Sequence, residues 1–146
     1  MSDEPASLLL KRDREVFAAI ADVLIPAAEG MPSATALGIE GEPMDHVLAL
    51  RPELANDLLR GLRAAAGAPD GAAAAERLNR EDPAAMGAIG LVASAAYYMQ
   101  PQVWKLLGYP GQTHRPVRPE EEDDFRENDL LQPVIDRGPI YRPTPD

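Results

Sequence analysis

Residues 82–111 read DPAAMGAIGLVASAAYYMQPQVWKLLGYPG, and this stretch decides the fold. Asp82 followed by Pro83 predicts the start of a helix, with an acidic N-cap and a proline at the first helical position. The helix is expected to run to about Met99, and Pro101 begins a second, shorter one. Glycine, alanine and serine fill the interior of the longer helix, so another helix should be able to approach it closely.

The large aromatic side chains gather at the end of this stretch. It holds the only tryptophan, Trp104, and three of the four tyrosines, Tyr97, Tyr98 and Tyr109. One interpretation places them at the centre of a partner-binding surface, where tyrosine and tryptophan are enriched. The other has Tyr97, Trp104 and Leu107 complete the helical core. The two are compatible if Trp104 fixes the turn and the tyrosines partly face outward.

Apolar periodicity predicts further helices upstream, and no useful strand-like alternation is present. Helices are expected over residues 9–25, in a short segment after Glu42-Pro43, over about 52–66 and over 72–79. The apolar stripe of the first helix consists of Val16, Phe17, Ile20, Val23 and Leu24. The sequence therefore predicts an all-α fold, a compact bundle of about five to six short helices within residues 1–117.

The composition changes from Pro110 onward. Seven of the 15 prolines lie in residues 110–146, around the acidic run at 120–124. Such a segment alone cannot bury enough apolar area to offset its ordering entropy. We expect residues 118–146 to form an extended acidic arm that either orders against a partner or folds back on its own helices. Its candidate contact residues are Phe125, Leu130, Leu131, Val134, Ile135, Ile140 and Tyr141.

Charge and composition exclude several classes of function. The net charge of −10 and the pI near 4.6 argue against binding to nucleic acid or to anionic membranes. No run approaches the roughly 18 apolar residues of a membrane span. The chain has no cysteine, which removes disulfides and thiolate chemistry. The N-terminal residues lack the pattern of a signal peptide, so we expect a cytoplasmic protein.

Few residues could carry catalysis. Asp45 and His46 are adjacent in a predicted helix, so their side chains point in different directions. His114 lies in a predicted loop with no nucleophile or second ligand placed near it. The acidic run at 120–124 lacks the ligand spacing and central glycine of a calcium loop. We therefore expect no catalytic, cofactor-binding or metal-binding residues in this chain, and a small enzyme that uses His114 is the remote alternative.

Two stretches resemble the gluconate 2-dehydrogenase subunit 3 family, the small subunits that accompany flavin-dependent dehydrogenases. Residues 16–26, VFAAIADVLIP, are similar to the family's opening helix, which ends in an acid, apolar residues and Ile-Pro. The resemblance covers roughly residues 10–117. Its more specific part is the order Tyr97-Tyr98-x-x-Pro101-x-Val103-Trp104-x-x-Leu107-Gly108-Tyr109-Pro110-Gly111.

The resemblance implies a non-catalytic subunit that binds and stabilises a large FAD-containing dehydrogenase of the glucose–methanol–choline type. Such partners oxidise alcohol groups of sugars or related compounds, and the FAD would belong to the partner. Members of the family often carry a twin-arginine signal, which this sequence lacks, so the complex is expected to stay in the cytoplasm or to use another chain's signal. The alternative is a stand-alone helical protein-binding module or regulator without a flavoprotein partner.

Overall fold

The computed structural model describes residues 9–113 and 131–140, and the regular structure in these ranges is helical, apart from an isolated bridge between Ala28 and Met31. The predicted all-α fold is confirmed. The elements are α1 (Lys11–Leu24), η2 (Thr35–Leu37), α2 (Glu42–Leu50), η3 (Pro52–Leu54), α3 (Ala55–Ala65), α4 (Gly71–Glu81), α5 (Pro83–Tyr98), α6 (Pro101–Leu107) and α8 (Gln132–Arg137).

Helix ends follow the local chemistry of the sequence. The Asp82 carboxylate accepts a hydrogen bond from the Ala85 backbone N–H at 3.1 Å and so caps α5, as predicted. The Arg60 guanidinium donates to the same carboxylate and holds the pKa of Asp82 below its ordinary value. Asp70 caps α4 in the same way, through the Ala73 N–H at 2.8 Å. These caps fix where the chain turns between successive helices.

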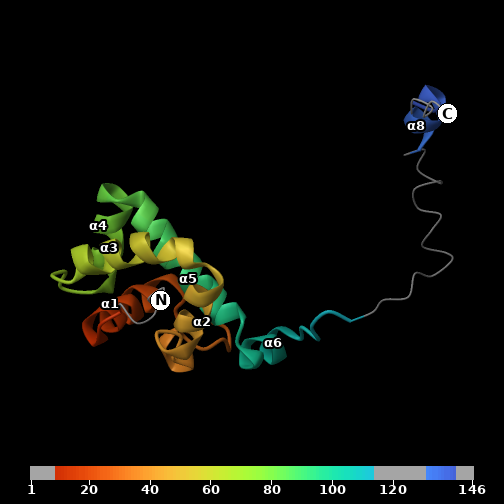
Figure 1. Ribbon diagram of the computed structural model, residues 1–146. Coiled ribbons are helices and arrows are strands. Elements are labelled where there is room, and N and C mark those ends of the chain that lie inside the picture. The colour runs from red at the N-terminus through yellow and green to blue at the C-terminus, as the bar shows by residue number, and fades with distance from the viewer. Residues whose placement is uncertain (1–8, 114–130, 141–146) are drawn as a thin grey trace. The chain divides into compact units, whose positions relative to one another are not determined.

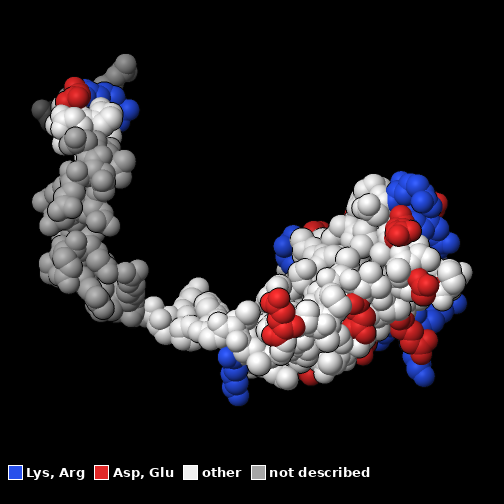
Figure 2. Space-filling model, turned by 180° about the vertical axis from the view of Figure 1, so that it is seen from behind, with Lys and Arg blue, Asp and Glu red and all other residues white. Residues whose placement is uncertain are grey.

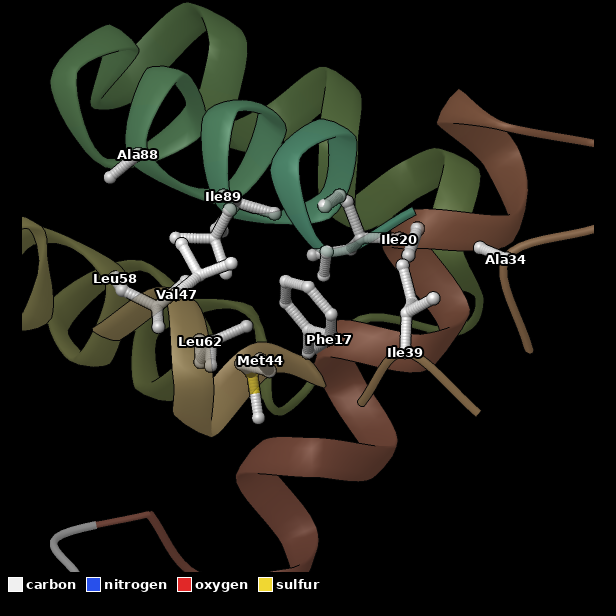
Figure 3. Close-up of a cluster of buried hydrophobic side chains, with 14 of the residues drawn as sticks. Phe17, Ile20, Ala34, Ile39, Met44, Val47, Leu58, Leu62, Ala88 and Ile89 are labelled. Carbon is white, nitrogen blue, oxygen red and sulfur yellow. The ribbon is translucent and has the colours of Figure 1, made fainter. Parts of the chain in front are cut away.

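The core lies between α1, α2, α3, α4 and α5 (Figure 1). Figure 3 shows the Phe17 ring of α1 among side chains from other elements, including Ile39, Met44 and Leu62. All four are fully buried. Helix α3 packs on α5, α1 packs on α4, and α2 packs on α5. Helix α5 is thus the element that most of the bundle shares.

Close helix approach occurs where the side chains are smallest. A Cβ atom added to Gly71, at the start of α4, would lie 2.1 Å from the backbone oxygen of Ala19 in α1. A Cβ at Gly61 in α3 would lie 2.9 Å from the Ala85 Cβ of α5. Close packing against α5 was expected; at Gly61 it occurs against Ala85, whereas there is open space beside Gly87.

The predicted apolar stripe of α1 is only partly correct. Phe17 and Ile20 are buried and Val16 is half-buried, whereas Val23 and Leu24 in the last turn are exposed. Periodicity places residues on one face of a helix, but it does not tell how far the neighbouring helices extend along it. The end of α1 is held instead by a polar contact, because Thr35 donates to Asp22 through Oγ1 at 2.6 Å and N at 2.8 Å.

The chain divides into two units, residues 1–111 and 112–146. In the second unit, the predicted arm carries the short helix α8, which has no buried residue. Gly138 ends this helix with a φ of 66°. Of the predicted contact residues, Phe125, Leu130 and Tyr141 lie outside the described residues.

Candidate protein-binding surface around helix α6

Helix α6 is attached to the bundle by one buried side chain. Val103 is fully buried, and no other residue of this helix is buried. Pro101 lies at the start of the helix, and Gly108 ends it with a φ of 65°. The Tyr109 N–H then donates to the Trp104 carbonyl at 2.8 Å, which closes a Schellman-type turn. The sequence thus fixes both ends of α6 while burying little of it.

The apolar face of α6 continues past the part that the bundle covers. Val103, Leu106 and Leu107 are spaced i, i+3 and i+4, so they share one side of the helix. Val103 is 0% exposed, but Leu107 is 56% exposed, and Leu106 is similar. Together with its aromatic neighbours this region forms what we call the α6 surface: Tyr98, Met99, Trp104, Leu106, Leu107 and Tyr109.

Two contacts position the Trp104 side chain within the α6 surface. The Trp104 indole N–H donates to the Tyr98 carbonyl. The rings of Trp104 and Tyr109 meet edge to face, with centroids 5.9 Å apart. Trp104 nevertheless remains 38% exposed, so it does not complete the core. A surface whose large side chains are already positioned loses little conformational entropy on binding.

The α6 surface carries little charge. Between Met99 and Thr113 the only charged residue is Lys105. Figure 2 shows the contrast, with acidic and basic side chains scattered over the helical body and a largely uncharged region where the chain leaves it. Groups of exposed apolar side chains mark interaction sites in soluble proteins, whereas single exposed apolar residues are ordinary.

Two open hollows border this region. One, of about 620 Å³, lies between α2 and the connection from α5 to α6, and it is lined in part by Asp45, His46, Met99 and Gln100. His46 is exposed there, as expected for a surface histidine. The other lies between the loop at 27–32 and two residues of α6, Gln102 and Leu106. Met99 of the α6 surface lines the first hollow, and Leu106 lines the second.

Tyr97 differs from the other predicted interface residues. It is 2% exposed, and its hydroxyl donates to the Pro32 carbonyl at 2.7 Å. Burial raises the pKa of this hydroxyl. Its ring meets Tyr98 edge to face, with centroids 5.4 Å apart. Tyr97 is therefore a core residue that positions the exposed Tyr98, and it cannot contact a partner directly as we had expected.

Tyr98, Trp104 and Tyr109 were predicted to bind a partner, with only the tyrosines expected to face partly outward, and all three side chains are exposed. Leu106 was not predicted, and one of the two interpretations had Leu107 complete the core. The spacing from Val103 already put both leucines on one helical side. The spacing could not reveal that no other helix covers this side of α6 beyond its first turn. Among the predicted arm residues that the structure describes, Leu131, Ile135 and Ile140 are exposed.

Within residues 9–113 and 131–140, no group of three or more His, Cys, Asp or Glu side chains is arranged to hold a metal ion. His114 lies outside these ranges. No helix in the same ranges is long and apolar enough to cross a membrane. Searches with family models, curated proteins and solved structures found no match to this chain.

Proposed function

We propose that this chain is a non-catalytic accessory subunit that binds and stabilises a larger protein through the α6 surface. The observation that carries the proposal is an ordered, nearly uncharged set of aromatic and aliphatic side chains left exposed beside a well-packed bundle. Aromatic anchors surrounded by less critical contacts are the usual energetic centre of protein interfaces. Trp104 and Tyr109 are the expected anchors.

The proposed partner is a large FAD-dependent dehydrogenase of the glucose–methanol–choline type, which oxidises alcohol groups of sugars or related compounds. Support comes from the resemblance of residues 97–111 to the small subunits of such enzymes. The positions that resemble the small-subunit motif have two different roles in this structure. Val103 and Gly108 attach and end α6, while Trp104 and Tyr109 remain accessible. A motif in which some residues fix the helix and others stay accessible is suited to presenting a binding surface. The FAD and the catalytic groups would belong to the partner.

Co-expression with the flavoprotein encoded beside this chain tests the proposal. The two proteins should co-purify, and the flavoprotein should be less soluble or less active when it is produced alone. Leu107→Glu should prevent co-purification, because a charge would be buried in an apolar interface. The matched control is Leu50→Glu, which changes an exposed leucine at the end of α2, outside the α6 surface.

Two results would contradict the proposal. One is a flavoprotein that is equally soluble and active without this chain and does not co-purify with it. The other is a Leu107→Glu variant that co-purifies as efficiently as the unchanged chain. The first result would favour a stand-alone binding module. The second would keep a partner but place its contact elsewhere on the molecule.

A further inference from the structure

The hollow of about 620 Å³ between α2 and the connection from α5 to α6 is lined by one side of α2. The lining positions of this helix are 42, 45, 46 and 49, which are spaced i, i+3, i+4 and i+7. Met99 and Gln100 line it from the connection. We call this space the α2 hollow. Since Met99 also belongs to the α6 surface, the two features adjoin.

The α2 hollow offers oxygen atoms that can accept hydrogen bonds. Gln100 Nε2 donates to the Ala96 carbonyl at 2.9 Å, which holds the amide group and leaves its Oε1 as an acceptor. The Arg14 guanidinium donates to Asp45 Oδ1 at 2.7 Å and so offsets the charge of that carboxylate. Glu42 is exposed, and within residues 9–113 and 131–140 no ion pair involves it. Its carboxylate is therefore the uncompensated charge of the hollow.

This charge selects the kind of group that the α2 hollow can hold. No Lys or Arg lines the hollow, so an anion would meet Glu42 without a compensating cation. A metal ion would need several closely placed ligands, and the part of the chain that the structure describes contains no group of three His, Cys, Asp or Glu side chains arranged to hold one. A single positive charge on an organic group is the best match.

The remaining lining residues favour a long side chain that carries this charge at its end. Pro43, Ala49 and Met99 offer apolar surface within the same hollow. Lysine and arginine pack their methylene groups on such surface while the charged end reaches polar partners. Glu42 and the Oε1 of Gln100 would be those partners.

We propose that the α2 hollow receives a lysine or arginine side chain of the protein that binds the α6 surface. This inference rests on the proposed function. Continuity points to one partner for both features, because Met99 belongs to both and Gln100 directly precedes α6. An apolar centre with a polar contact at its edge is the usual arrangement of a protein interface. A charge pair at this edge would fix the orientation of the partner on the α6 surface.

The test measures the dissociation constant of the complex between the full chain and the flavoprotein encoded beside it. Glu42→Gln should weaken binding roughly tenfold, because the partner's cation loses its charged acceptor while the shape of the side chain is kept. The control is Glu76→Gln, which removes the same charge from an exposed position of α4 and should change the dissociation constant less than about twofold. Thermal unfolding of each variant alone checks that the bundle is intact.

Salt separates the charge from the shape of the side chain. The difference between Glu42→Gln and the unchanged chain should shrink as salt is added, because salt screens the attraction between Glu42 and a cation. A loss of affinity that is the same at low and high salt would contradict the inference. An equal loss for Glu76→Gln would also contradict it, because the net charge of the chain and not the hollow would then set the affinity.

The outcomes distinguish this inference from the proposed function. If Glu42→Gln binds as tightly as the unchanged chain while Leu107→Glu does not bind, the α2 hollow receives no cation and the accessory role stands. If the unchanged chain does not bind the flavoprotein at all, both fail.

Discussion

Helices α5 and α6 are separated by only two residues, yet they bury their side chains very differently. Helix α5 buries seven of its 16 residues, and six of the seven are alanine, valine or isoleucine. Helix α6 buries one of its seven. Small residues and Tyr97 pack in α5, whereas Trp104, Leu106 and Leu107 of α6 stay at the surface. Burying aromatic side chains is favourable, and exposed aromatic clusters of this kind are typical of protein-binding surfaces.

The strongest way to test the packed half of this comparison is Gly71→Ala. The new Cβ would lie 2.1 Å from the Ala19 backbone oxygen, so α1 and α4 must move apart. We expect a loss of about 3 kcal/mol in the free energy of unfolding, measured by denaturant titration. The control is Gly87→Ala, which meets no atom within 4 Å and should stabilise α5 by about 0.5–1 kcal/mol. Equal effects at the two sites would disprove the close approach.

Two substitutions within α6 sharpen the contrast between its attached and exposed parts. Val103→Ala removes buried methyl groups and should cost about 2 kcal/mol in the free energy of unfolding of the chain alone. Leu107→Ala should cost less than about 0.5 kcal/mol, because the side chain is exposed. A large cost for Leu107→Ala would mean that the leucine packs within the chain and is not available to a partner.

Removing the hydroxyl group from each of the two adjacent tyrosines tests the same contrast between a buried and an exposed side chain. Tyr97→Phe removes the hydroxyl that donates to Pro32 and should lower the free energy of unfolding by about 1 kcal/mol. Tyr98→Phe should leave it unchanged, because this side chain is exposed. Thermal unfolding of the two variants measures both. Equal stability of the two would show that the buried hydroxyl does not hold α5 to the loop that contains Pro32.

The smallest expected effect is a pH dependence at the end of α1. Burial acts to raise the pKa of Asp22, but hydrogen bonds from Thr35 and Ser33 outweigh it and keep the pKa below its ordinary value. The ionised form therefore stabilises the fold above roughly pH 4, and this stability is lost as the pH falls through the lowered pKa. Asp22→Asn should cost about 1 kcal/mol at pH 7, measured by denaturant titration.

The cost of Asp22→Asn should shrink as the pH falls below about 4, because the unchanged Asp22 then becomes protonated as well. The same titration repeated at pH 3 measures this change. A cost that stays the same at both pH values would show that the negative charge of Asp22 contributes nothing to holding Thr35.

Local sequence signals predicted the helices well because their ends depend on neighbouring residues. Asp82 with Pro83 located the start of α5, and the apolar spacing located the inward side of α1 at Phe17 and Ile20. The exposure of Val23 and Leu24, and of Leu107, could not be predicted. Burial at those positions depends on where distant helices end, which short-range periodicity does not encode.

The candidate site was predictable in kind but not in detail. Residue type pointed to Tyr98, Trp104 and Tyr109, since these side chains are typical of interfaces. Residue type alone could not predict that Tyr97 is buried while Tyr98 is exposed. The two side chains differ in the direction in which they point from the helix. That direction is set by the packing of α5, which turns Tyr97 toward Pro32.

Hydrogen–deuterium exchange of α6, in the isolated chain and in the complex with the flavoprotein, tests the central claim most directly. In the isolated chain the amides of α5 should exchange slowly and those of α6 quickly, because α6 has a single buried anchor. In the complex the α6 amides should become protected, while those of α5 change little. Protection of α6 that is the same with and without the flavoprotein would contradict the claim that this surface binds a partner.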